Sequence, residues 1–294
     1  MKQYPMDKVR NVVLLGQGRS GKTSFVEAAL YLNKGTDRFG KVNDGTTVSD
    51  YDPEEIRRQI SISLTVAPVE YQGCKLNLID TPGYLDFVGE VMQGVRVAET
   101  ALIVVSGKDG PGVGTEKGFA YATAGGLSKL FFVGRMDEEH VDYFKVVEQL
   151  RETFGISVCP INCPIMEGDR MVGLVDFVER NVKTFKNGVA EVRELPEDIG
   201  PQASHLWDML SESVAETSEE LMEKYFGGEY FTRDETVQAL KAGIAEGTIA
   251  PVMCGSAISL EGVNLVVDML AKATPSPADR GETQATVDGK EAAL

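Results

Sequence analysis

The sequence has no excess of positive charge. It carries 29 Lys and Arg residues against 45 Asp and Glu residues, which gives a net charge of -16. Because a phosphate backbone needs a basic surface, this balance argues against a chain that clamps nucleic acid by itself, although local patches could still contact a ribonucleoprotein. We therefore expect no sequence-specific nucleic acid among its partners.

Cysteines and long apolar runs are also scarce, and this narrows the class of protein. The four cysteines are scattered, and the two that lie near each other, Cys159 and Cys163, have no matching second pair. We interpret them as buried thiols rather than zinc ligands. The sequence opens without an apolar signal segment and holds no apolar run of membrane length. We expect a cytoplasmic protein without a membrane partner.

A glycine-rich segment carries the strongest motif. Residues 16–23 fit G-x-x-x-x-G-K-[ST], between an apolar run at 11–15 and a helical pattern at 22–33. Backbone amides in such a loop and the dipole of the following helix hold phosphates. We expect Lys22 to reach the outer phosphates and the Thr23 hydroxyl to ligate Mg²⁺. The expected nucleotide-binding residues here are Gly16, Gln17, Gly18, Arg19, Ser20, Gly21, Lys22, Thr23 and Ser24. The alternative interpretation is a glycine turn between a strand and a helix that binds no phosphate.

The periodicity predicts an α/β fold with a doubly wound, mostly parallel sheet. Residues 34–60 hold no strong period and predict a long surface loop. The expected strands are 62–71 and 75–80, paired as a hairpin, then 100–106, 130–133 and 251–254. The expected helices are 86–98, 116–124, 138–154 and 262–273.

Residues 156–249 interrupt this alternation and predict an inserted α+β subdomain. A hairpin is expected over 182–192 around Asn187-Gly188, with amphipathic helices over 204–226 and 234–246. The composition after residue 274 is typical of a linker with little order. We therefore divide the chain into a nucleotide-binding domain at 1–155 and 250–275, an insert at 156–249, and a linker or tail at 276–294.

A second phosphate-facing loop is predicted at Asp80-Thr81-Pro82-Gly83, directly after the apolar run at 76–79. We expect Asp80 to hold Mg²⁺ through a water and the Gly83 amide to bond the γ-phosphate. Such a turn is weak evidence alone. As the second element after a P-loop it is strong evidence, and it favours a GTPase.

With these two loops, the chain resembles the translational GTPases, and the elongation factor G family most closely, over nearly its whole length. Residues 57–62 are similar to that family's switch I, and 255–258 to its loop that touches guanine O6. Residues 156–249 are similar to its G′ subdomain, and 274–279 to the connection into its second domain. Tyr84 and Ser24 are typical of the elongation-factor-G-like group, which is also similar to ribosomal-protection (tetracycline-resistance-like) factors.

The resemblance implies a GTPase that binds GTP and GDP with Mg²⁺, and that works with the ribosome, its stalk protein and its large-subunit RNA in a full-length factor. It implies metal ligation by Thr23, Ser61 and Asp80, and catalytic roles for Lys22, Ser61, Gly83 and Tyr84. Base recognition is implied for Gly134, Arg135, Asp137, Ser256, Ala257 and Ile258.

Two departures from the family pattern affect affinity and turnover. Gly134 replaces the asparagine of Asn-Lys-x-Asp, while Asp137 is kept, so we expect weakened but guanine-selective binding. Arg135 replaces the lysine and can lay its guanidinium plane over the base. Tyr84 replaces a histidine that orients the attacking water. Because a phenol with a pKa of about 10 is a poor base at neutral pH, we expect slow hydrolysis.

Two further departures concern charge and metal ligation. Arg19 stands at an aspartate position of the P-loop, where it either faces the phosphates or points to solvent. Ser61 replaces a threonine and keeps the hydroxyl. Two alternative functions stay open: a nucleotide-binding interaction module that has lost GTP turnover, and a P-loop enzyme that uses ATP. Asp137 argues against ATP, because adenine offers no donor pair at that edge.

Overall fold

The fold is built on a large sheet whose strands are almost all parallel. The computed structural model describes residues 2–281 except 187, together with 284–287 and 290–293. In that part of the chain seven strands lie in the order β2-β3-β1-β4-β5-β11-β6, and only the β2–β3 pair is antiparallel. Their bounds are β1 Val9–Leu15, β2 Thr65–Tyr71, β3 Cys74–Asp80, β4 Thr100–Ser106, β5 Ser128–Gly134, β6 Val158–Pro160 and β11 Ala250–Cys254.

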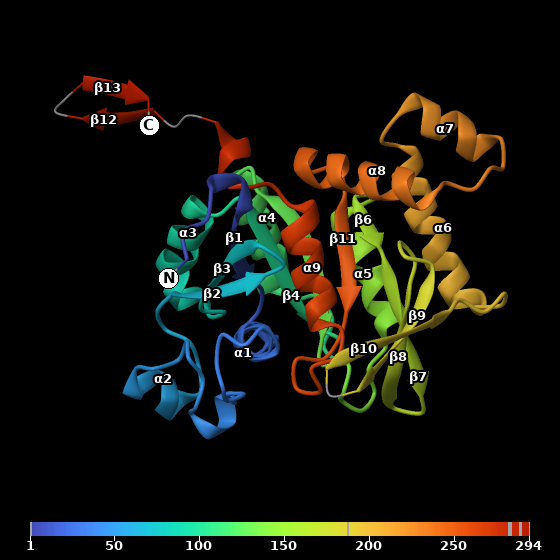
Figure 1. Ribbon diagram of the computed structural model, residues 1–294. Coiled ribbons are helices and arrows are strands. Elements are labelled where there is room, and N and C mark those ends of the chain that lie inside the picture. Colours follow the sequence, from blue (N-terminus) through green and yellow to red (C-terminus); the bar gives the residue numbers. More distant parts are fainter. Residues whose placement is uncertain (1, 187, 282–283, 288–289, 294) are drawn as a thin grey trace.

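Helices cover both faces of this sheet, which explains why its central strands are continuous apolar runs. Every residue of β4 and β5 is buried. On one face α1 (Lys22–Leu32) packs against α9 (Val263–Ala273), and α8 (Arg233–Glu246) packs beside α9. The other face holds α3 (Val88–Val97), α4 (Val113–Ala124) and α5 (Tyr143–Phe154) (Figure 1). The predicted α/β class with a mostly parallel sheet is confirmed.

A smaller antiparallel sheet lies beside the large one, in the order β10-β9-β8-β7 (Figure 1). Its elements are β7 Asn162–Glu167, β8 Arg170–Asp176, β9 Asn181–Lys186 and β10 Val189–Glu194, followed by α6 Pro201–Ala215 and α7 Glu219–Phe226. The β9–β10 pairing agrees with the expected hairpin, although Asn187 itself lies outside the described residues. The β7–β8 hairpin was not predicted. Its strands have no clean alternation of apolar and polar residues.

Several boundaries differ from the sequence expectation for local reasons. Helix α5 begins at Tyr143 rather than at 138, because the Asp142 side chain caps it by accepting a hydrogen bond from the Lys145 amide at 3.0 Å. Strand β6 falls within the expected insert but pairs with β11 in the large sheet. The division of the chain into domains stays a prediction.

The segment after residue 274 was expected to have little order, and here the structure differs. Thr274 and Ser276 are buried, and a 3₁₀ turn at Pro277–Arg280 packs on the body of the protein. Arg280 donates to the Ala98 carbonyl at 3.0 Å. Beyond it, β12 (Gln284–Val287) pairs with β13 (Lys290–Ala293) and projects from the body in Figure 1. The Arg280 side chain therefore holds the first part of a segment whose composition predicted a linker.

The expected surface loop at 34–60 is held by two buried glutamates. It contains helix α2 (Pro53–Arg58), which begins with a capping box at Asp52. Glu55, 1% exposed, accepts hydrogen bonds from the Ile62 and Ser63 amides at 2.8 and 3.0 Å. Glu27 of α1, fully buried, accepts one from the Val48 amide. Hydrogen bonds to these two side chains therefore hold a segment whose sequence shows no helix or strand periodicity.

The role of Glu55 can be tested by mutation. Glu55→Ala removes the acceptor of the Ile62 and Ser63 amides, so we expect a loss of about 1 kcal/mol in the free energy of unfolding and faster proteolysis within 34–60. Urea denaturation and limited proteolysis measure these effects. Glu54→Ala is the matched control, because the Glu54 side chain makes surface ion pairs with Arg57 and Arg58. Equal effects of the two variants would contradict the anchoring role.

Candidate functional site

The carboxyl ends of β1, β3, β5 and β11 meet at one edge of the large sheet and border a cavity of about 400 Å³. This is where ligands bind in open α/β sheets. The cavity is lined by Gly18, Arg19, Ser20, Gly21, Lys22, Thr23, Ser24, Val42, Asn43, Asp50, Gln59, Ile60, Ser61, Gly83, Tyr84, Phe132, Gly134, Arg135, Asp137, Glu138, Ala257 and Ile258. The two predicted phosphate loops, switch I and the base-reading segments therefore border one cavity.

Glycine is required at both ends of the P-loop. Gly16 has φ +134° and lies so close to the Val104 carbonyl that a Cβ would collide with it. Gly21 has φ +106° and precedes α1, whose first amides no side chain caps among the described residues. An uncapped helix start presents unpaired N–H groups and the positive end of the helix dipole. This loop therefore forms a ready anion site.

Lys22 is folded under the P-loop. Its side chain donates hydrogen bonds from Nζ to the carbonyls of Gly16 and Gln17, at 3.1 and 3.0 Å. The residue is 6% exposed, and burial lowers its pKa to about 8, against the opposing effect of Asp80 and Asp50. A buried ammonium whose partners are neutral carbonyls favours an anion beside it.

The three predicted metal ligands lie together. Thr23 donates from Oγ1 to Oδ2 of Asp80 at 2.8 Å, and its Oγ1 lies 3.2 Å from the Ser61 hydroxyl. Asp80 is 1% exposed, and burial raises its pKa to about 6. Its second oxygen, Oδ1, is buried without a hydrogen-bond partner. A buried, unpaired carboxylate oxygen beside two hydroxyls suits a hard cation such as Mg²⁺.

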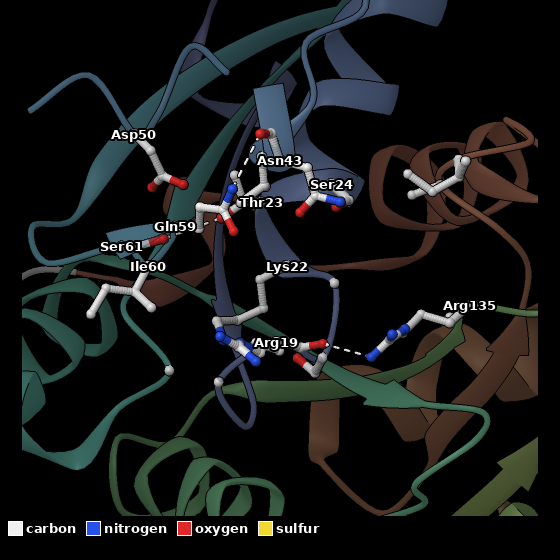
Figure 2. Close-up of a pocket in the computed structure, with 18 of the residues that line it drawn as sticks. Arg19, Lys22, Thr23, Ser24, Asn43, Asp50, Gln59, Ile60, Ser61 and Arg135 are labelled. Carbon is white, nitrogen blue, oxygen red and sulfur yellow. Dashed lines mark hydrogen bonds between the residues drawn. The ribbon is translucent and has the colours of Figure 1, made fainter. Parts of the chain in front are cut away.

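Asp50 joins this cluster, and the sequence analysis missed it. Figure 2 shows it opposite Thr23, on the segment that leads to Ser61. Asp50 is 5% exposed, its Oδ1 also lacks a partner, and burial raises its pKa. A lone aspartate in a loop without period gave no signal. The described residues contain no group of three or more Asp, Glu, His or Cys side chains that could hold a metal. A cation here would thus take part of its shell from water and phosphate, as Mg²⁺ commonly does.

The predicted second phosphate loop packs directly against the P-loop. A Cβ at Gly83 would come within 2.5 Å of Lys22 Nζ and 2.6 Å of Gly18 Cα. A Cβ at Gly18 would lie 3.0 Å from the ring of Tyr84. Thr81 is turned inward and donates to the Leu14 carbonyl at 2.5 Å. Of the predicted residues, Gly16, Thr81 and Pro82 line a smaller neighbouring cavity, and Gln17, Asp80 and Ser256 line neither.

On the base side, Asp137 and Ser256 are coupled. The Ser256 hydroxyl donates to Asp137 Oδ1 at 2.5 Å and accepts from the Ser259 amide at 3.0 Å. Ser256 is fully buried, so its hydroxyl orients the Asp137 carboxylate from the protein interior. Ala257 and Ile258 line the cavity. At Gly134 a Cβ would lie 3.1 Å from the ring of Phe132, which also lines the cavity and was not predicted.

Arg135 spans the gap between the base side and the P-loop. It donates from Nη1 to the carbonyl oxygen of Arg19 at 3.1 Å, the dashed line beside Arg135 in Figure 2. It also pairs with Glu138, another lining residue that the sequence analysis missed. Arg19 itself is exposed and has φ +66°. The expectation for Arg19 had left two orientations open, and the side chain lies exposed at the cavity rim.

Comparisons with known proteins agree on one family. Residues 7–276 match the model of the elongation factor Tu GTP binding domain. Elongation factor G from Chlamydia trachomatis, in serovars D and A, is 33% identical over 290 residues, which cover 96% of this chain and 42% of each relative. A crystal structure of a protein from Thermus thermophilus superposes with a TM-score of 0.87 and 34% identity, over 96% of this chain and 43% of that one.

This chain thus spans about two-fifths of the length of the relatives it matches. No helix among the described residues combines the length and the apolar character needed to cross a membrane. Three findings lead to the same assignment: the family match over most of the chain, the mostly parallel sheet and the glycine loop at its edge. The chain belongs to the elongation factor Tu GTP-binding domain family, as a translational GTPase domain similar to that of elongation factor G.

Proposed function

We propose that this chain binds GTP and GDP with Mg²⁺ and hydrolyses GTP slowly, as the GTP-binding domain of an elongation-factor-G-like protein. The observation that carries the proposal is the meeting of Lys22, Thr23, Ser61 and Asp80 beneath one glycine loop. Three of them bring oxygen ligands, and the fourth brings a buried positive charge. Such a set neutralises a polyphosphate and its metal together.

The metal and phosphate contacts follow from this arrangement. Thr23, Ser61 and Asp80 would hold Mg²⁺, which supplies charge neutralisation between the outer phosphates when bound. Lys22 binds the outer phosphates, and the Gly83 amide binds the γ-phosphate. Because Ser61 and Gly83 lie on different segments, loss of the γ-phosphate would release both segments at once.

Base selection depends on Asp137. Its carboxylate, oriented by Ser256, accepts hydrogen bonds from guanine N1 and the 2-amino group. Gly134 provides no side chain to support the base, which argues for weaker binding than the family pattern gives. Asp137 is also the reason to favour guanine over adenine, because adenine has no matching donor pair.

Hydrolysis is proposed to be slow because of Tyr84. Its ring lies near Gly18 at the loop that faces the γ-phosphate, but a phenol is a poor base at neutral pH. In a full-length factor we propose a cytoplasmic role on the ribosome, with the 156–249 insert toward the stalk protein and the GTP-binding domain toward large-subunit RNA. The resemblance to elongation factor G supports these partners.

The second candidate is a nucleotide-binding module without turnover. It is favoured by the close packing of Gly83 and Tyr84 on Gly18 and Lys22, which narrows the space for a third phosphate. A single-turnover assay with and without ribosomes separates the two candidates. Release of γ-phosphate under either condition supports the GTPase, and its absence under both supports the module.

Nucleotide binding is tested at Lys22. Lys22→Ala removes the buried cation, and we expect GDP and GTP affinity to fall by at least about 100-fold, equivalent to about 3 kcal/mol. Isothermal titration calorimetry gives the affinity, and circular dichroism checks the fold. Lys145→Ala, an exposed lysine on α5, is the control. Retained affinity in Lys22→Ala would contradict the P-loop assignment.

Base recognition is tested at Asp137. We expect Asp137→Asn to shift preference from GDP to XDP, because the amide complements xanthine, while its oxygen can still accept from Ser256. Calorimetry with GDP, XDP and ADP measures the preference. Asp234→Asn, at a side chain 90% exposed on α8, should leave it unchanged. An Asp137→Asn variant that still prefers GDP would refute the assignment.

Turnover is tested at Tyr84. An imidazole titrates near neutral pH, so we expect Tyr84→His to raise the single-turnover rate by about tenfold or more. Tyr84→Phe should leave the rate unchanged, because the phenol is not the base. Phosphate release is followed on preloaded GTP, with and without ribosomes. A rate that falls in Tyr84→Phe would show that the hydroxyl contributes directly.

A further inference from the structure

We propose that Glu138 is a positioning residue for the nucleotide base: together with the carbonyl of Arg19, it fixes the Arg135 guanidinium as one wall of the base pocket. The inference rests on the proposed guanine-nucleotide function and deepens it. It assigns a role to a carboxylate that the GTPase motifs do not include.

The contacts of Arg135 carry the proposal. Its Nε and Nη2 both reach Oε1 of Glu138, at 2.6 and 2.5 Å, and its Nη1 donates to the Arg19 carbonyl at 3.1 Å. All three nitrogens of the guanidinium are therefore engaged, which fixes both the place and the tilt of its plane. The side chains of Arg135 and Glu138 are 34% and 27% exposed, so water only partly screens the pair.

The backbone supports the same conclusion independently. Arg135 has φ +63°, a left-handed conformation that a residue with a long side chain adopts only where its surroundings hold it. Its Cγ lies 4.0 Å from the place where Gly21 would carry a Cβ, so the aliphatic stem packs near the P-loop. The left-handed backbone of Arg135 and the three hydrogen-bonded nitrogens of its guanidinium together direct its side chain across the cavity.

The other charged side chains near this pair lie farther away and are more exposed, so they do not take over the role of Glu138. Asp109 Oδ2 lies 3.8 Å from Arg135 Nη1, and that carboxylate is 60% exposed. Lys108 Nζ lies 4.0 Å from Oε2 of Glu138, and its side chain is 47% exposed. Exposed pairs at these distances fix little geometry. Glu138 is thus the anion that sets the conformation of Arg135.

The clamp lies beside the position where the base-reading motif lost a side chain. Gly134 contributes no side chain to the base pocket, whereas Arg135, Asp137 and Glu138 all line it. A guanidinium can donate to Glu138 and to the Arg19 carbonyl while a base stacks on it. This is possible because its N–H donors lie in the guanidinium plane and leave the face of the plane free. A lysine ammonium has no face to offer, so arginine and glutamate act as a pair.

A double-mutant cycle tests the inference. Glu138→Gln, Arg135→Lys and the double variant are titrated with GDP and with Mg²⁺-pyrophosphate, which has no base. We expect each single variant to weaken GDP binding by about tenfold, and the double variant to be no weaker than Arg135→Lys alone. Pyrophosphate affinity should change by less than about threefold, because the glycine loop that cradles phosphate remains.

The controls separate positioning from a structural effect. Glu139→Gln, at the adjacent exposed carboxylate, should bind GDP like the wild type. Equal losses for GDP and pyrophosphate with a lower unfolding midpoint, strictly additive losses, or unchanged GDP affinity in Glu138→Gln would each overturn the inference. A wild-type chain that binds pyrophosphate but not GDP would overturn the proposed function as well, so the two failures are distinguishable.

Discussion

The hydrogen bond between Thr23 and Asp80 is the constraint on which the site depends. It joins the first turn of α1 to the last residue of β3, 57 positions apart, at 2.8 Å. Around it Asp80 and Lys22 are almost fully removed from water, and burial moves both pKa values toward neutrality. Burying opposite charges without direct pairing costs free energy. The packing of the surrounding fold must offset this cost. A bound ligand of opposite charge would reduce the cost.

A second constraint is the attachment of the 34–60 segment. Glu27 reaches it from α1, Glu55 ties its helix to the start of β2, and Asp50 turns from it into the cavity. Burial raises the pKa of Glu27, so this anchor too is maintained against a desolvation cost. The segment is therefore ordered by few side chains rather than by a core of its own. Such segments belong to the low-stability end of a fold and can rearrange with a ligand.

Much of the fold could be predicted from local pattern. Runs such as 100–106 can only be buried strands between helices, and the glycine loop after 11–15 fixes the edge at which ligands bind. Thr23 and Ser61 line the cavity together with Gly134, Arg135 and Asp137, while their roles toward a ligand stay predictions. Asp50 and Phe132 were not predicted, because their place at the cavity depends on how distant segments pack. Glu138 was not predicted because no motif includes it. The packing of Pro277–Arg280 was also not predicted, since composition does not reveal that Arg280 meets Ala98 and Glu99.

The amino-acid order alone determined most elements of the large sheet, their alternation and the place of the glycine loop, because periodicity, glycine placement and motif spacing act over a few residues. It did not reveal α2 or the β7–β8 hairpin. Tertiary structure decided which polar groups are buried away from water and which side chains come into contact. Asp50 comes to lie opposite Thr23, and Arg135 comes to donate to the Arg19 carbonyl, only when distant segments close over the same cavity. The physical reason is that desolvation and hydrogen-bond geometry are properties of the packed chain, and no short stretch of sequence encodes them.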